Sequence, residues 1–181
     1  MQNSSDSLPK FKYFEDPYSD GYQRQFEESD GVCACCRQVR GYRYMQSPYG
    51  KHVDGEICPW CIADGSAAAK LGVEFVDAAS CRDEVTTGED ELAQRTPAFV
   101  SWQGEAWRAH CGEPCCFVGD GSPAKVRELQ DEISDVLDEI AEFQELTREQ
   151  VIDMVHPPGP FNIYLFRCVR CGTHCASWDT D

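Results

Sequence analysis

The chain has 181 residues, of which 41% are hydrophobic, so it can form one domain of ordinary size or two small ones. Its formal charge of −16, with 16 scattered basic residues, argues against phosphate backbones as partners and favours a basic protein surface. The chain has no apolar run of membrane-spanning length and no secretory signal, which predicts a cytoplasmic protein without a membrane partner, whose cysteines are thiols or metal ligands.

The first cysteine group consists of two Cys-x2-Cys pairs separated by twenty-one residues, namely Cys33 with Cys36 and Cys58 with Cys61. Two residues between cysteines let both sulfurs face one ion from a tight turn, and two such turns supply the four thiolates of a tetrahedral zinc site. Residues 41–45 alternate like a strand, residues 47–50 resemble a turn, and residues 55–57 return to the second pair. This order predicts a zinc ribbon, followed by a short helix over residues 62–71 that ends at a glycine.

The second cysteine group joins residues that lie far apart in the chain. A Cys-x3-Cys pair near the middle and a Cys-x2-Cys-Gly knuckle near the end give the predicted ligands Cys111, Cys115, Cys168 and Cys171. Strand-like residues 161–166 lead into the knuckle, which predicts a second ribbon around a second structural zinc. Cys116 could replace Cys115, and His110 adjoins the pair, so the ligand set stays open between them.

Residues 122–160 form a helical insertion between the two halves of this second unit. Apolar residues recur at spacings of three and four along residues 126–143, and acidic residues occupy the opposite face, which predicts an amphipathic helix of about 20 residues. We expect its apolar stripe to pack on the ribbons, although a partner-binding or dimer helix would show the same pattern. Thr147 to Gln150 form a capping box that begins a second helix, and residues 156–160 supply a rigid, proline-rich link.

These elements predict an α+β fold with two zinc-ribbon-like β units and a helical insertion packed on them. We expect a single zinc-stabilised domain over residues 1–181. Its first ribbon half would span residues 9–80, and its second would combine residues 81–121 with residues 161–181.

Several sequence segments of the chain resemble those of the CbrC family of bacterial proteins. The most specific is the run from Cys58 to Ala68, CPWCIADGSAA, and the others are LPKFKY at 8–13, GYRY at 41–44, WRAHC at 107–111, and YLFRCVRCG at 164–172. The resemblance implies a role in tolerance to a colicin of the DNase kind, because the family's named member is associated with it. The chain departs from the family at Arg37, where a glycine is frequent, and at Cys81, Cys116 and Cys175, which are additions.

Other chemistries have weaker support. A redox role for the Cys58–Cys61 pair would require an exposed thiolate, and a catalytic zinc would require an open coordination position, for which His110 and His174 are the only neighbouring candidates. We therefore expect no catalytic residues. The sequence favours a non-enzymatic, zinc-stabilised protein-binding module, with a toxin-neutralising immunity protein as its most specific form. The alternative is a zinc-ribbon nucleic-acid or transcription regulator using Arg37, Arg40 and Arg43, and the third is a metal-dependent enzyme.

Overall fold

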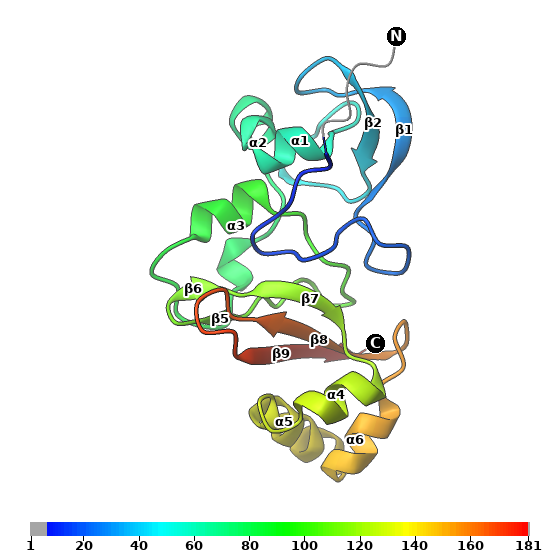
Figure 1. Cartoon of the computed structure of the whole chain (residues 1–181), viewed down its shortest axis with the longest axis vertical. Coiled ribbons are helices and arrows are strands. Elements are labelled where there is room, and N and C mark those ends of the chain that lie inside the picture. The colour runs from blue at the N-terminus through cyan, green and yellow to red at the C-terminus, as the bar shows by residue number, and fades with distance from the viewer. Residues whose placement is uncertain (1–6, 181) are drawn as a thin grey trace.

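The computed structural model describes residues 7–180 and confirms the α+β class. Small antiparallel sheets alternate with short helices, and the ribbon separates the first cysteine unit at one end from the helical insertion at the other (Figure 1). The helices are α1 (Pro59–Ala63), α2 (Ser66–Leu71), α3 (Glu89–Arg95), α4 (Pro123–Leu129), α5 (Ser134–Gln144) and α6 (Arg148–Met154), with a 3₁₀ turn η1 at Ala78–Ser80. No helix among the described residues is long and apolar enough to cross a membrane.

Two hairpins carry a cysteine knuckle at their tips. In the first, β1 (Phe26–Val32) pairs with β2 (Val39–Tyr44), and in the second, β8 (Phe161–Arg167) pairs with β9 (His174–Thr180). The strand expected at residues 161–166 is confirmed as β8. A third strand, β7 (Cys116–Asp120), pairs with β8 and completes a three-stranded sheet.

The rest of the first unit differs from a plain zinc ribbon. Residues 55–57 make a single parallel bridge from Glu56 to Cys33 and no return strand, because α1 begins at Pro59, directly after Cys58. We expected one helix over residues 62–71, but the structure has two, α1 and α2. Gly65, with φ +79°, separates α1 from α2, and Gly72 ends α2 in the left-handed conformation as predicted.

Two short strand pairs form the remaining sheets. β3 (Tyr49–Gly50) pairs with β4 (Val73–Glu74), and β5 (Ala109–His110) pairs with β6 (Glu113–Pro114). One apolar cluster runs through both cysteine units, because it includes Cys33 and Cys58 of the first as well as Cys168 of the second. Its largest fully buried side chain is Trp107, whose ring lies 5.3 Å from that of Phe99.

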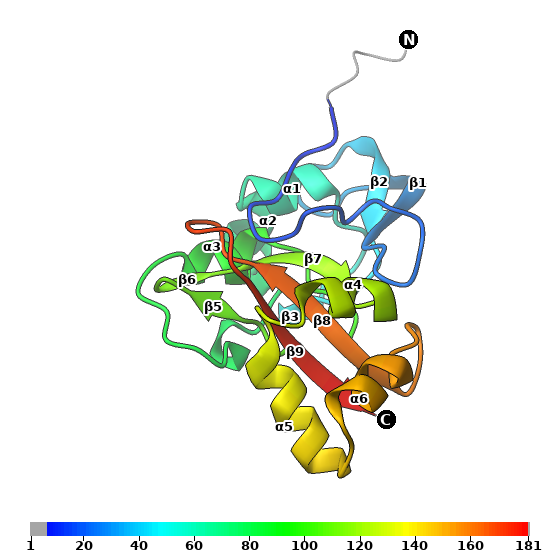
Figure 2. The same ribbon diagram turned by 60° about the horizontal axis from the view of Figure 1, so that its bottom comes forward.

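The helical insertion covers one face of the three-stranded sheet (Figure 2). The predicted packing of its apolar stripe is confirmed by a second cluster that joins the helices to β8 and β9. This cluster contains Val126, Leu129, Ile133, Val136, Leu137, Ile140, Val151, Ile152, Val155, Phe161, Ile163, Leu165 and Ala176. The prediction of a single helix of about 20 residues is wrong, since a turn at residues 130–133 separates α4 from α5. At this turn the Glu132 carboxylate accepts hydrogen bonds from the backbone N–H (2.7 Å) and ring (3.1 Å) of His174, which ties the turn to β9. The capping box at Thr147 is present as predicted.

Candidate metal centres

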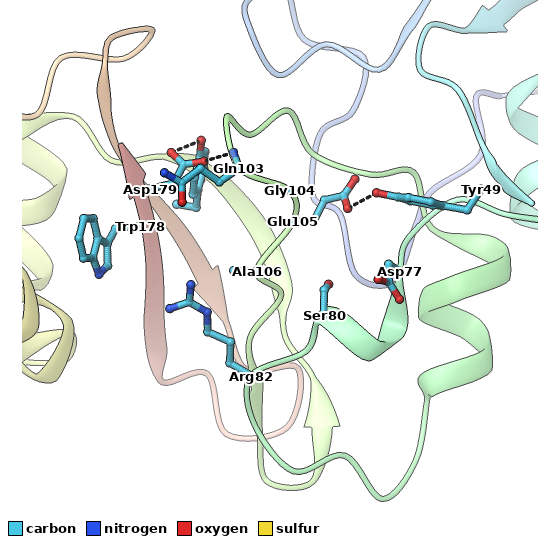
Figure 3. A pocket seen from close by; sticks show the side chains of 11 residues that line it. Tyr49, Asp77, Ser80, Arg82, Gln103, Gly104, Glu105, Ala106, Trp178 and Asp179 are labelled. Carbon is cyan, nitrogen blue, oxygen red and sulfur yellow. Dashed lines mark hydrogen bonds between the residues drawn. The ribbon is translucent and has the colours of Figure 1, made fainter. Parts of the chain in front are cut away.

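A polar cleft of about 330 Å³ lies beside β9 and η1. Figure 3 shows Arg82 and Trp178 on one side of it, and Glu105 facing Tyr49 on the other. The Tyr49 hydroxyl donates a 2.7 Å hydrogen bond to Glu105, and burial raises the pKa of that carboxyl. The residues that line the cleft, all within the described part of the chain, include no histidine or cysteine. The groups of side chains close enough together to hold a metal ion within residues 7–180 are instead the two cysteine groups.

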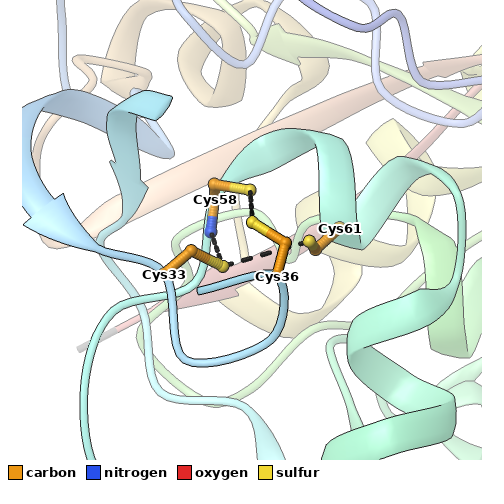
Figure 4. Close-up of side chains that lie close together, drawn as sticks. All are labelled: Cys33, Cys36, Cys58 and Cys61. Atoms are coloured by element: carbon orange, nitrogen blue, oxygen red, sulfur yellow. Dashed lines mark hydrogen bonds between the residues drawn. The ribbon is translucent and has the colours of Figure 1, made fainter. Parts of the chain in front are cut away.

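The first cysteine group is assembled as the sequence predicted. Cys33 and Cys36 come from the β1–β2 knuckle, Cys58 and Cys61 come from the start of α1, and Figure 4 shows their sulfurs converging on one point. All four Sγ atoms lie within 4.8 Å of one another. Three of the four residues are buried, which places the group inside the apolar cluster.

The spacing of these sulfurs fits a tetrahedral metal ion. Zinc bonds of about 2.3 Å to each sulfur would separate neighbouring sulfurs by about 3.8 Å. The observed distances are 3.9 Å between Cys33 and Cys61 and 4.0 Å between Cys36 and Cys58. These distances match a tetrahedral site, so the group could hold one metal ion.

Backbone donors prepare the first knuckle for negative charge. The N–H of Cys58 points at the Cys33 sulfur at 3.4 Å. Burial alone would raise the pKa of the Cys33 thiol, but N–H groups of Cys36, Cys58 and Cys35 outweigh it and lower that pKa to about 7. A sulfur that ionises this readily is a good metal ligand, since it is the thiolate that binds the ion.

The second group contains a histidine. His110, Cys111, Cys168 and Cys171 present one ligand atom each, all within 4.8 Å of one another. The Cys111 and Cys171 sulfurs are 3.8 Å apart, and Nδ1 of His110 lies 3.3 Å from each of them. Zinc bonds of about 2.0 Å to nitrogen and 2.3 Å to sulfur would place nitrogen and sulfur about 3.5 Å apart. The donor set therefore fits a tetrahedral ion with three sulfurs and one nitrogen.

A tight hairpin turn explains why His110 and Cys111 are neighbouring donors. Cys111 and Gly112 connect β5 to β6 with φ values of +56° and +73°. Positive φ at both central residues is the signature of a type I′ turn, which matches the twist of a two-residue hairpin. The turn leaves His110 and Cys111 at the tip, opposite the knuckle that carries Cys168 and Cys171.

Cys115, the expected fourth ligand, lies outside this group. After the turn, β6 carries the chain away from the tip at about 3.3 Å per residue, and Cys115 ends fully buried with its carbonyl accepting a 2.9 Å hydrogen bond from Trp107 Nε1. Its sulfur lies 3.6 Å from that of Cys175 instead. Cys116 is also elsewhere, with its thiol bonded to the carbonyl of Phe117. Of the alternatives that the sequence left open, His110 is the residue that lies within the second group.

The two hairpin knuckles share one backbone pattern, although the sequences around them differ. In the first, the N–H of Arg37 donates to the Cys33 carbonyl at 2.9 Å, and in the second, Gly172 donates to Cys168 at 3.0 Å. Arg37 has φ +61° and Gly172 has φ +80°, so Arg37 adopts the left-handed conformation for which glycine is better suited. This repetition supports a metal-binding role for both knuckles.

A buried carboxylate secures the second centre to the rest of the protein. Glu113, which follows the hairpin turn, accepts hydrogen bonds from Lys12 Nζ at 2.5 Å, from the Tyr13 hydroxyl at 3.0 Å and from Arg170 Nε at 2.6 Å. The Lys12 and Arg170 contacts lower the pKa of Glu113 to about 2. Because Arg170 lies between Cys168 and Cys171, this network holds the knuckle against the N-terminal segment.

His174, the other histidine near the second group, is no part of it, because its ring is bonded to Glu132. In the sequence, His110 stands out only because it precedes Cys111, and this position does not distinguish it from Cys115 as the fourth donor. The type I′ turn at Cys111 and Gly112 places His110 beside the other donors, and Gly112 was the sequence feature that indicated such a turn.

Comparison with known proteins places the chain in a family. Residues 8–180 match the model of an uncharacterised protein family, UPF0167. The UPF0167 protein PA1536 of Pseudomonas aeruginosa is 38% identical over 184 residues, covering 96% of this chain and 97% of its own length. The UPF0167 protein Mb2317 of Mycobacterium bovis is 36% identical over 177 residues, covering 95% of this chain and 93% of its own. No solved structure matches. The chain, with one group of four cysteines and another of one histidine and three cysteines, therefore belongs to the UPF0167 family.

Proposed function

We propose that this chain is a non-enzymatic module with two structural zinc ions that binds a basic protein partner through its acidic helical layer. We further propose that the partner is a bacterial toxin of the nuclease type. The chain's resemblance to the CbrC family, with its link to colicin tolerance, supports the toxin as the specific partner. A protein that neutralises such a toxin would act as an immunity or tolerance protein.

The charge of the helical layer is the observation that carries this proposal. Residues 122–160 hold ten acidic and three basic side chains. The apolar face of α4 to α6 is already packed on β8 and β9, so this layer presents mainly carboxylates to solvent. A nuclease must grip phosphate with a basic surface, and an acidic layer complements such a surface.

The metal groups favour a structural role. Each offers four donors, and a zinc ion with four protein ligands has no position left for a substrate. The first group is also largely buried within the apolar cluster. Zinc at these sites would contribute to folding, and binding would be left to the outer surfaces.

The nucleic-acid alternative loses support at the arginines on which it depends. Arg43 forms salt bridges with Glu27 and Glu56, and Arg40 lies over the Trp60 ring at 4.4 Å from its centroid. These contacts offset or occupy two of the three basic side chains on the first knuckle. The charge of Arg43 is thus offset by two carboxylates, and the overall charge of −16 further disfavours a phosphate backbone as partner.

The enzyme alternative rests on the second centre, where His110, Cys111 and Cys171 are exposed. A substrate could approach an ion there only by displacing one of four ligands. Water among the ligands of the loaded protein, measured by X-ray absorption, would favour an enzyme over the binding module.

The binding proposal is tested by association kinetics with purified basic nuclease domains of bacterial toxins. The suitable acidic residues are those without a structural partner. Asp138 is paired with Arg148 through two 2.5 Å contacts, whereas neither Asp131 nor Glu142 forms a salt bridge within residues 7–180. The variant Asp131→Lys, Glu142→Lys should slow association at least tenfold at low salt, and raising the salt should reduce this difference.

A control variant, Glu28→Lys with Asp30→Lys, makes the same charge change on β1, at the other end of the molecule (Figure 1). It should slow association much less than the helical variant. Equal effects of the two variants would show that only net charge matters. Failure of every toxin to bind, together with binding to duplex DNA or RNA, would overturn the proposal in favour of the regulator.

A further inference from the structure

A pair of cysteines outside both metal groups has the geometry of a redox site. The sulfurs of Cys115 and Cys175 lie 3.6 Å apart. Cys115 follows β6 and is fully buried, whereas Cys175 lies in β9 and is half-buried, so Cys175 is the member of the pair that keeps contact with solvent. Both metal groups already contain four donors, and neither of these cysteines is among them. The pair therefore has no role in holding the metals.

The surroundings of the pair distinguish its two sulfurs. Arg108 lies alongside, held by a 2.8 Å hydrogen bond to Asp83 and by a bond from Nη1 to the carbonyl of Ala176, which follows Cys175. The hydrogen bond with Cys115 lowers the pKa of the Cys175 thiol, the charge of Arg108 lowers it further, and burial opposes both. The same hydrogen bond and burial raise the pKa of the Cys115 thiol. The partial exposure of Cys175 and the nearby charge of Arg108 therefore favour Cys175 as the sulfur of the pair that ionises.

We propose that Cys115 and Cys175 form a redox-active dithiol, which a hydroperoxide oxidises to an intramolecular disulfide. The reachable Cys175 thiolate attacks one peroxide oxygen, the O–O bond breaks, and Cys175 becomes a sulfenic acid while the other oxygen leaves as water after protonation. The Cys115 thiol then attacks the Cys175 sulfur, the S–O bond breaks, and a second water leaves. Overall, two thiols and one hydrogen peroxide give one disulfide and two waters. A small dithiol reverses the reaction by thiol–disulfide exchange.

The geometry makes this disulfide accessible. A disulfide bond is about 2.05 Å long, so the sulfurs must approach each other by about 1.5 Å. Rotation of the Cys175 side chain can supply much of this movement, because Cys175 is not fully enclosed. Cys81 is a rival partner, since it is half-buried and its charge would interact with that of Cys175. No hydrogen bond joins Cys81 to Cys175 among the described residues, so the structure favours Cys115.

The test uses the full-length, zinc-loaded protein treated with hydrogen peroxide. Trypsin leaves Cys111, Cys115 and Cys116 on one peptide and Cys171 with Cys175 on another, so tandem mass spectrometry is needed to place the bond. We expect the loss of two free thiols per chain, a bond between Cys115 and Cys175, and both zinc ions retained. Dithiothreitol should restore the two thiols.

Matched variants separate this site from its neighbours. Cys175→Ser and Cys115→Ala should each abolish the disulfide, and the half-buried position of Cys175 makes the first the safer variant for folding. Cys175→Ser should also slow thiol loss more than tenfold, whereas Cys115→Ala should still lose the Cys175 thiol, which stays a sulfenic acid because no second thiol condenses with it. Cys116→Ser, which alters a buried cysteine directly beside Cys115, should oxidise like the wild type, as should Cys81→Ser. A disulfide from Cys81 to Cys175, or oxidation of the metal group at Cys111, Cys168 and Cys171 with zinc release, would overturn the proposal.

Discussion

Nδ1 of His110 lies 3.3 Å from the sulfur of Cys171, although 61 residues separate them in the chain. The contact joins the tip of the β5–β6 hairpin to the knuckle between β8 and β9. The turn that places the histidine there has positive φ at Cys111 and Gly112. The relationship distinguishes His110 from Cys115 as the fourth donor of the second group.

The first prediction concerns this donor. His110→Ala should reduce the metal content from about two ions per chain to about one, because the remaining three sulfurs leave the exposed site incomplete. His110→Cys should retain about two, since it supplies a fourth thiolate. Metal analysis of protein purified without chelator measures both.

The control for this prediction is Cys115→Ser. It removes the cysteine of the Cys-x3-Cys pair, but the structure places that residue outside the group, so about two metals should remain. A loss of one metal from Cys115→Ser, with none from His110→Ala, would return Cys115 to the ligand set.

The second prediction concerns the first centre. Cys58→Ser should unfold or aggregate the protein, because structural zinc contributes about 10–16 kcal/mol in small metal domains, as much as the whole stability of a typical protein. Circular dichroism and sedimentation measure the outcome. Cys35→Ser is the control, since Cys35 is buried beside the same knuckle but its sulfur contacts Ser66 Oγ at 3.4 Å. A folded Cys58→Ser protein with normal metal content would exclude the site.

The residues that could be predicted from the sequence are those whose spacing is local. The Cys-x2-Cys pairs and the capping box at Thr147 depend on contacts within a few residues, and both appear as expected. The apolar stripe of the insertion was also sufficient to predict which side would be buried. In each case one periodic or short-range pattern determines the structure.

The differences arise where distant contacts decide between similar local structures. A continuous helix over residues 126–143 satisfies the local spacing, but the bonds from His174 to Glu132 favour a break there. Cys115 fits a metal knuckle by spacing, but the apolar core around Trp107 and the sulfur of Cys175 hold it elsewhere. Neither contact can be derived from the chain before the sheet is known.

The third prediction concerns the backbone of the knuckles. Arg37 and Gly172 occupy equivalent positions with positive φ, where a side chain costs about 1–2 kcal/mol. Gly172→Ala should therefore destabilise by about 1 kcal/mol, although a Cβ there meets no atom within 4 Å. Arg37→Gly should be neutral or stabilising by up to about 1 kcal/mol, because relief of strain exceeds the greater flexibility of the unfolded chain.

Denaturant unfolding of the metal-loaded protein measures these two changes against the wild type. We expect Gly172→Ala to lower the free energy of unfolding and Arg37→Gly to raise it or leave it unchanged. If Arg37→Gly destabilised the protein by as much as Gly172→Ala, the side chain of Arg37 rather than its backbone would be the important feature.

The last prediction concerns Asp120 at the end of β7. Burial and the nearby charge of Asp179 raise the pKa of Asp120 to about 6, while a 2.8 Å hydrogen bond from Gln23 opposes the increase. The folded state therefore holds the proton more tightly than the unfolded chain, whose aspartates ionise near pH 4. Between about pH 4 and pH 6 the stability of the protein should fall as the pH rises, and above this range the penalty should be constant.

Asp120→Asn should remove the penalty, because the amide is neutral and its oxygen can still accept the bond from Gln23. The variant should be about 1–2 kcal/mol more stable than the wild type at pH 7, a value reduced from the full pKa shift because Asp120 is only partly buried. This stability advantage should shrink as the pH falls from 7 to 5. More acidic buffers are avoided because protonation of the metal ligands would weaken metal binding. Urea unfolding at both pH values measures it, with the exposed Asp131→Asn as a control that should show no such dependence. A constant or growing advantage at pH 5 would mean that Asp120 ionises normally in the folded protein.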